Sequence, residues 1–224
     1  MDQPYRGFLI ALMAAGLAVL VVASWYYLYR RPRDANAPHR LGREMGLQPL
    51  NTGDRTHPVW YGGRVGDHDF ALTYANLRYG SYGPRFEKKV EDVRLSLRLA
   101  IAIHAADPQD IIAYFRHDRP HEAGETPENF DAAFDRRNTE RLSQESRDAL
   151  LRFAQSYGGL RLRDRATAPE ELFVAEALPD AQVVLVHDRP GYKQTPQQVS
   201  ALLDALVETA SPLEEALSAI SRKP

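Results

Sequence analysis

The longest regular pattern in the chain is an alternation of apolar and polar residues over positions 93–104, "VRLSLRLAIAIH". Successive side chains of a β-strand point to opposite faces, so this period of two predicts a strand with one buried and one polar face. At about 3.3 Å per residue the strand is about 35–40 Å long. Strands of this length are unusual, and we therefore expect this one to bend or to leave its sheet at one end.

Shorter apolar runs, separated by turn residues, predict further strands. Residues 57–80 read as a β-hairpin with a bulge at Gly62–Gly63 and a turn at 66–69. We expect residues 111–117 to return as the antiparallel partner of the long strand. Residues 160–164 alternate as a strand, and 171–177 and 181–188 are expected to pair across "LPD".

Three segments have the period and the end signals of helices. Residues 142–159 have Ser143 as a cap at the start and Gly158 as a stop. A second helix starts after Thr195, whose capping box is completed by Gln198, and continues to about residue 221. A short helix is expected within 39–47. These elements predict an α+β domain, in which a mainly antiparallel sheet is covered by two or three helices.

The N-terminal pattern differs, because 23 residues from Gly7 to Tyr29 carry no charge. A helix needs about 20 apolar residues to cross a bilayer core, so this run predicts a transmembrane helix that binds the lipid bilayer. Its end has the composition of a membrane interface, with aromatic and then basic residues: Trp25, Tyr26, Tyr27, Tyr29, Arg30, Arg31 and Arg33. A cleaved signal peptide is the alternative, but the apolar run continues past the small residues at 21–23.

The chain is thereby divided into a tail (1–6), a transmembrane helix (7–29), a basic juxtamembrane linker (30–39) and a soluble α+β domain (40–224). Arg6 precedes the span, whereas five arginines follow it by residue 43. Basic residues stay on the cytoplasmic side, so we expect a single-pass protein with its N-terminus outside and its domain in the cytoplasm. The Arg- and Ala-rich composition suggests a bacterial inner membrane. The alternative orientation places the domain in the periplasm or outside the cell.

Composition excludes several kinds of chemistry. The chain has no cysteine, which rules out disulfides, thiolate nucleophiles and cysteine-ligated metals. From residue 44 onward the chain keeps 22 of its 28 basic and 28 of its 30 acidic residues, a net charge of −6. A net acidic domain is not expected to bind nucleic acid in general. There is no nucleophile-elbow, Walker or dinucleotide-binding motif, and we expect no cofactor.

The tetrapeptide His-Asp-Arg-Pro occurs at 117–120 and again at 187–190. We interpret both copies as exposed strand ends, because Pro lacks the N–H that would continue a ladder. A metal site is the alternative at the first copy, using His117, His121 and the 67–69 segment "DHD". That site would need a helix, which Pro120 disfavours, and in a strand the two histidines lie about 13 Å apart.

Basic residues mixed with Tyr and Gly form one further candidate site. They could bind an anionic partner, although a solvated loop beside a strand has the same composition. The residues are Arg78, Arg85, Lys88, Lys89, Arg94 and Arg98. We expect a non-catalytic binding, scaffold or sensor module with a protein partner. The alternative is a membrane-tethered hydrolase or metal-dependent enzyme that uses the region of His117 and His121.

Overall fold

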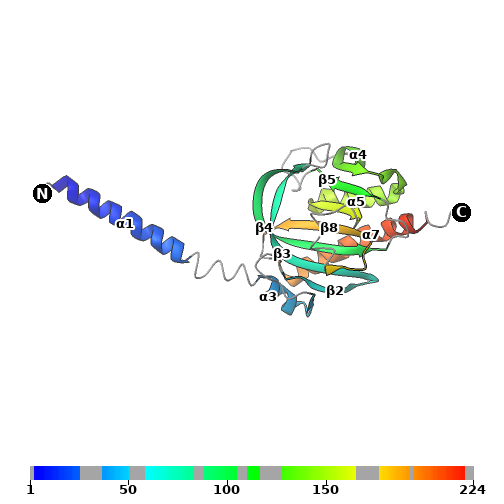
Figure 1. Cartoon of the computed structure of the whole chain (residues 1–224), viewed down its shortest axis with the longest axis horizontal. Helices are drawn as coiled ribbons and strands as arrows, with labels where there is room; N and C mark the ends of the chain where they lie inside the picture. The colour runs from blue at the N-terminus through cyan, green and yellow to red at the C-terminus, as the bar shows by residue number, and fades with distance from the viewer. Residues whose placement is uncertain are drawn as a thin grey trace. The chain divides into compact units, whose positions relative to one another are not determined.

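The structure is a computed structural model that describes residues 3–25, 37–50, 59–82, 88–104, 110–116, 128–164, 177–191 and 194–219. For 3–11, 37–38, 75–82, 88–95, 190 and 219 it describes the backbone only. Contacts divide the chain into two units, Met1–Ala37 and Pro38–Pro224 (Figure 1). The first unit contains helix α1, and the second contains the α+β domain.

The described elements follow one another along the chain in this order: α1 (Gln3–Trp25), α3 (Ala37–Glu44), β1 (Gln48–Pro49), β2 (Tyr61–Val65), β3 (His68–Tyr82), β4 (Lys88–Ile103), β5 (Ile112–Phe115), α4 (Phe130–Ala133), β6 (Phe134–Arg137), the 3-10 helix η2 (Thr139–Arg141), α5 (Gln144–Tyr157), β7 (Leu160–Asp164), β8 (Val183–Pro190) and α7 (Pro196–Ala219).

The described strands form one eight-stranded sheet in the order β1-β2-β3-β4-β8-β7-β5-β6. Every pair of neighbouring strands is antiparallel, which confirms the predicted α+β class with an antiparallel sheet. The predicted partner of the long strand was wrong, because β5 pairs with β6 and β7 while β8 lies beside β4. The second neighbour of β4, strand β8, comes from a segment about 80 residues farther along the chain, so the local sequence pattern could not identify it.

The long strand leaves the sheet at one end, as its length predicted. Strand β4 pairs with β3 from Lys88 to Ile101, but β8 pairs with β4 only from Leu97 to Ile103. The remaining part of β3 and β4 is therefore a two-stranded ribbon, visible as the curved arm in Figure 1. Its register shifts between Tyr79 and Gly80, whereas Gly62 and Gly63 pair without a break. The expected hairpin is confirmed, and the expected bulge at Gly62–Gly63 was wrong.

Strand β8 has neighbours on both sides. It pairs with β4 over Val183–Arg189 and with β7 over Val183–His187. Residues 171–176 lie outside the described residues, but no edge of that stretch of β8 remains for a hairpin with them, so the predicted pairing across "LPD" was wrong. Ala177–Ala181 instead forms a turn, in which the Ala181 N–H donates to the Leu178 carbonyl at 3.2 Å.

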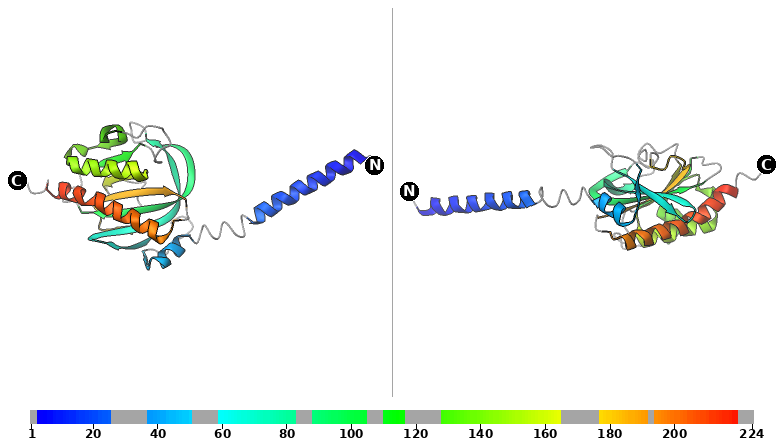
Figure 2. Two further views of the ribbon diagram at one scale, coloured as in Figure 1. Left: turned by 180° about the vertical axis from the view of Figure 1, so that it is seen from behind. Right: turned by 90° about the horizontal axis from the view of Figure 1, so that it is seen from below.

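Helices α5 and α7 lie along the same face of the sheet, which we call the helix face (Figure 2). In β4 this face carries Leu97, Leu99, Ile101 and Ile103, all fully buried. The predicted alternation therefore forms the main core, and the prediction that helices cover one face is confirmed.

The other face of the sheet, which we call the opposite face, is also buried over much of its extent. Small residues of three strands pack there beneath Trp60 and the Ala177–Ala181 turn. They are Ala71, Ala100, Ala102, Val184 and Val186. The polar face expected for β4 thus carries a second, thinner core, because small side chains leave room for a covering segment.

The caps of both long helices match the sequence signals. The Ser143 hydroxyl accepts from the Ser146 N–H at 3.1 Å, and Gly158 follows α5 with φ of +70°. At α7 the Thr195 N–H donates to Gln198 Oε1 at 3.0 Å, and the Gln198 N–H donates to Thr195 Oγ1 at 3.3 Å, forming the capping box. Pro212 lies inside α7, which continues to Ala219.

Helix α1 covers 23 residues, and the described large apolar side chains in it are 55–68% exposed. The helix itself agrees with the sequence. The side chains of α1 are described only from Leu12 onward. Among the described residues, no helix is long and apolar enough to cross a membrane. The membrane crossing is therefore not supported by this finding and stays a prediction.

Candidate functional site

The chemically richest part of the described domain centres on two adjacent residues of β8, His187 and Asp188. Neighbouring residues of a strand point to opposite faces, so these two side chains lie on the two sides of the sheet. His187 pairs in register with Leu99 and faces the helices, while Asp188 pairs with Arg98 on the opposite face. Both are buried, His187 completely.

His187 fastens the end of α5 to the sheet. Its Nδ1 lies 3.1 Å from the Gly158 carbonyl oxygen, so Nδ1 carries the proton and donates. The imidazole meets the Phe153 and Tyr157 rings edge to face, with centroids at 5.2 and 6.3 Å. Burial lowers the pKa of His187 to about 4, although Asp188 and the bond to Gly158 oppose the shift. Among the described residues, Nε2 has no hydrogen-bond partner.

Asp188 binds two arginines from the strands on either side of β8. Arg98 of β4 makes a bidentate ion pair, with Nε at 2.8 Å from Oδ1 and Nη2 at 3.0 Å from Oδ2. Arg161 of β7 donates to the same Oδ2. All three side chains are at most one tenth exposed. The carboxylate thus connects β4, β8 and β7 across the centre of the sheet.

A second polar contact lies next to this ion-pair cluster. Arg163 of β7 donates to the Tyr114 hydroxyl of β5, and its guanidinium lies 5.5 Å from the Tyr114 ring centroid. Because it connects the next two strands on the same face, the polar network extends from β4 to β5. Each of these contacts joins neighbouring strands, and this arrangement is typical of side chains that hold a sheet together.

The arrangement favours a structural role for His187 and Asp188. The imidazole is fully buried between aromatic rings, and the carboxylate oxygens accept hydrogen bonds from guanidinium groups. A general base must instead reach the proton that it removes. The prediction that the second His-Asp-Arg-Pro copy is exposed was therefore wrong.

The prediction for the proline of that copy is confirmed for the ladder between β4 and β8, although an isolated bridge between Ser96 and Gly191 follows Pro190. The ladder between β4 and β8 ends with the pair Leu97–Arg189, directly before Pro190. The burial of His187 and Asp188 was not predicted, although "VVLVHD" does not alternate between apolar and polar residues. A run of this kind indicates a strand buried on both faces, and this signal was available in the sequence. The first copy, with His117 and Pro120, lies outside the described residues, as does His121.

The residues of "DHD" do not gather into one site. His68 is buried on the helix face, whereas Asp67 and Asp69 are exposed. Arg64 lies beside both aspartates, with its Nε 3.7 Å from the Asp69 carboxylate and its Nη2 3.5 Å from the Asp67 carbonyl oxygen. Among the described residues, no group of three or more His, Asp or Glu side chains could hold a metal ion.

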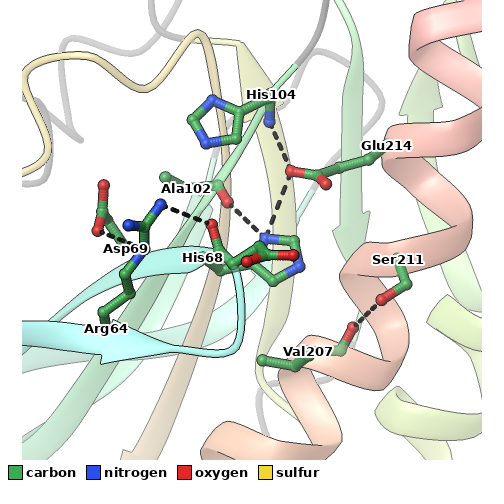
Figure 3. A network of polar contacts seen from close by, with 9 residues as sticks. Arg64, His68, Asp69, Ala102, His104, Val207, Ser211 and Glu214 are labelled. Atoms are coloured by element: carbon green, nitrogen blue, oxygen red, sulfur yellow. Dashed lines mark hydrogen bonds and ion pairs between the residues drawn. The ribbon is translucent and has the colours of Figure 1, made fainter.

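His68 instead belongs to a contact between α7 and two strands (Figure 3). Its Nδ1 lies 3.3 Å from Glu214 Oε1 and 3.3 Å from the Ala102 carbonyl oxygen. Glu214 Oε1 also accepts from the His104 backbone N–H at 2.8 Å. Glu214 thus connects the second half of α7 to the beginning of β3 and the end of β4, and no sequence motif indicated this link.

The predicted basic patch is described only in part. Arg98 lies in the sheet and binds Asp188, as given above. Arg78 pairs with Val93 in the ribbon, and Lys88, Lys89 and Arg94 are placed by their backbones alone. Arg85 lies outside the described residues, so the patch stays a prediction.

Of the predicted interface residues after the apolar run, Trp25 ends α1 and is 55% exposed. Tyr26, Tyr27, Tyr29, Arg30, Arg31 and Arg33 lie outside the described residues. Comparisons of the chain with protein-family models, with curated proteins and with solved structures found no match. The functional argument therefore depends on the residues of this chain alone.

Proposed function

We propose that the chain is a single-pass protein of a bacterial inner membrane, anchored through residues 7–29, whose cytosolic α+β domain is a binding, scaffold or sensor module for a protein partner. The observation that carries the anchoring is the surface of α1. Its exposed large apolar side chains are Leu12, Met13, Leu17, Val19, Leu20, Val21, Val22 and Trp25.

Exposure of these side chains to water is unfavourable. Covering a large apolar side chain contributes roughly 1.5–3 kcal/mol, so hydrocarbon around all of them would contribute on the order of 10 kcal/mol. The uncharged sequence extends beyond them, from Gly7 to Tyr29. The basic residues that follow it favour a cytoplasmic domain.

A binding role is supported by what the chemically capable groups of the described domain do. Asp188, Glu214 and the buried histidines His68 and His187 bind neighbouring elements and stabilise the fold. None of these contacts aims a pair of acid and base groups at a common point where a substrate would react. This arrangement favours a module whose surface binds a partner over a catalytic one.

Extraction of membranes tests the anchoring. Alkaline carbonate should leave the full chain in the membrane pellet, whereas detergent should release it, because hydrocarbon holds α1 and pH does not alter this interaction. A matched variant with Leu12, Leu17 and Leu20 replaced by Arg should appear in the supernatant. Complete release of the unaltered chain by carbonate would contradict an integral anchor.

Crosslinking in intact membranes tests the binding role. A protein partner should be captured by the full chain and not by the anchor segment alone (residues 1–39). Substitution of exposed residues of the domain should then remove the crosslink without releasing the chain from the membrane. A chain that crosslinks only through its anchor segment would contradict the proposed role of the domain.

A further inference from the structure

Helix α3 is a short amphipathic helix whose inner side is fastened to the sheet. Leu41 is 1% exposed. Gly42 lies so close to Tyr61 of β2 that an added Cβ would be 2.4 Å from the ring. His39 Nδ1 lies 2.6 Å from the Tyr61 hydroxyl. These contacts fix the orientation of α3 within the domain.

The outer side of α3 carries two exposed arginines. Arg43 Nε donates to the His39 carbonyl oxygen at 3.2 Å, which holds this side chain along the helix surface. Arg40 Nε lies 3.8 Å from Glu44 Oε1, and the two side chains are 55% and 47% exposed. Exposed pairs of this length are weak and screened by salt, so Arg40 can exchange Glu44 for another anion.

The position of α3 in the chain brings these arginines near the proposed anchor. Eleven residues, 26–36, separate the described end of α1 from the start of α3. Even a fully extended chain of this length spans at most about 40 Å. Residues 30–44 contain five arginines against Asp34 and Glu44, while the chain from residue 45 onward is net acidic. Anionic lipid would therefore attract the segment with α3 and repel the rest of the domain.

We propose that α3 is a membrane-docking element whose Arg40 and Arg43 bind the phosphates of anionic lipid headgroups. Because α3 is fixed to β2 through the contacts of His39 and Gly42 with Tyr61, this contact also sets the orientation of the whole domain against the bilayer. The inference rests on the proposed anchoring by α1. It adds a second, electrostatic contact with lipid and names the residues that make it.

The absence of cysteine allows a direct test with the full chain in nanodiscs. A fluorophore is attached at Gln48→Cys, an exposed position of β1, and energy transfer to acceptor-labelled lipid headgroups is measured. A second label at Ala132→Cys, on α4 beside β6 at the other edge of the sheet, serves as reference. Adding phosphatidylglycerol to phosphatidylcholine discs should raise transfer from position 48 and not from position 132.

Charge variants identify the residues responsible. Arg40→Gln/Arg43→Gln should return transfer from position 48 to its value in phosphatidylcholine, while Arg40→Lys/Arg43→Lys should keep most of the increase. The matched control Arg136→Gln/Arg152→Gln removes two other exposed arginines and should change nothing. Fluorescence of buried Trp60 verifies that each variant is folded.

The outcomes separate this inference from the anchoring on which it rests. A chain that enters nanodiscs but shows transfer independent of phosphatidylglycerol, or equal transfer in the Gln variant, would overturn the docking role of α3 and leave the anchor intact. Failure of the unaltered chain to enter nanodiscs would overturn both. High salt should remove the increase without releasing the chain, because screening weakens only the electrostatic contact.

Discussion

At the scale of single residues, His187 and Asp188 show how one dipeptide stabilises two sides of a sheet. The imidazole holds the end of α5 through the Gly158 carbonyl, and the carboxylate joins β4 to β7 through Arg98 and Arg161. The two groups can be tested separately, since the contribution of His187 depends on pH and that of Asp188 depends on its ion pairs with the two arginines.

Acid should destabilise the domain through His187. Its pKa is about 4 in the folded chain and near 6.5 in the unfolded one, so only the unfolded chain takes up the proton between these values. The contribution of neutral His187 is therefore complete above pH 6.5 and is lost as pH falls toward 4, by about 3 kcal/mol in all. Urea unfolding of the full chain in detergent, followed by Trp60 fluorescence in a Trp25→Phe background, measures this change.

The control for that experiment is His187→Gln, whose amide can still donate to Gly158 but does not titrate. The free energy of unfolding of the unaltered chain should fall more steeply with decreasing pH than that of the variant. Parallel curves would mean that another group causes the acid sensitivity.

Removal of the Asp188 charge should be costly. Asp188→Asn leaves Arg98 and Arg161 buried without the carboxylate that both bind, and loss of one partner of a buried ion pair costs about 3–5 kcal/mol. Thermal unfolding of the same detergent-solubilised chain should show a large fall in Tm. Asp180→Asn, at an exposed turn position, is the matched control and should leave Tm unchanged. Similar Tm values for the two variants would argue against a stabilising cluster.

At the scale of elements, α7 is held at both ends by different means. The capping box of Thr195 and Gln198 defines its start, whereas Glu214 binds the second half of the helix to the sheet near His68 and His104 (Figure 3). The cap is local in sequence, and the Glu214 contact joins residues more than 100 positions apart.

Truncation of this side chain tests the contact. Glu214→Ala should lower the free energy of unfolding by about 1.5–3 kcal/mol, the usual contribution of hydrogen bonds to a charged group. Amide exchange at His104 should accelerate, because its N–H loses its acceptor. Glu215→Ala, at the neighbouring exposed position, should do neither. Unchanged exchange at His104 in the Glu214 variant would show that this hydrogen bond does not persist in solution.

At the scale of the whole molecule, the proposed topology follows from the asymmetry of basic residues around α1. A reporter fused to the C-terminus should be active only if it is of a kind that works in the cytoplasm, because five arginines follow the apolar run and one precedes it. Replacement of Arg30, Arg31 and Arg33 by Gln should reduce this preference. Activity of a periplasm-dependent reporter on the unaltered chain would place the domain outside the cytoplasm.

Much of the fold could be predicted from the local sequence pattern. The alternation in β4, the turn between β2 and β3 and the caps of α5 and α7 each depend on residues within a few positions of one another. The candidate site could be predicted less completely. His187, Asp188, Arg161 and Glu214 come from separate elements, and only the non-alternating run of β8 indicated that its two polar residues are buried.

The sequence by itself determined the alternation of β4 and which of its faces packs against helices, the caps that start α5 and α7, and that one segment of the chain is uncharged over 23 residues. These properties follow from side-chain order and backbone preference. Only the tertiary structure decided that β8 lies between β4 and β7, that β5 lies away from β4, and that the opposite face of the sheet is covered. These outcomes depend on which distant segments bury each other's surfaces most completely. The local alternation of apolar and polar residues does not show which strand will be the neighbour, because a strand has the same pattern whichever neighbour it pairs with.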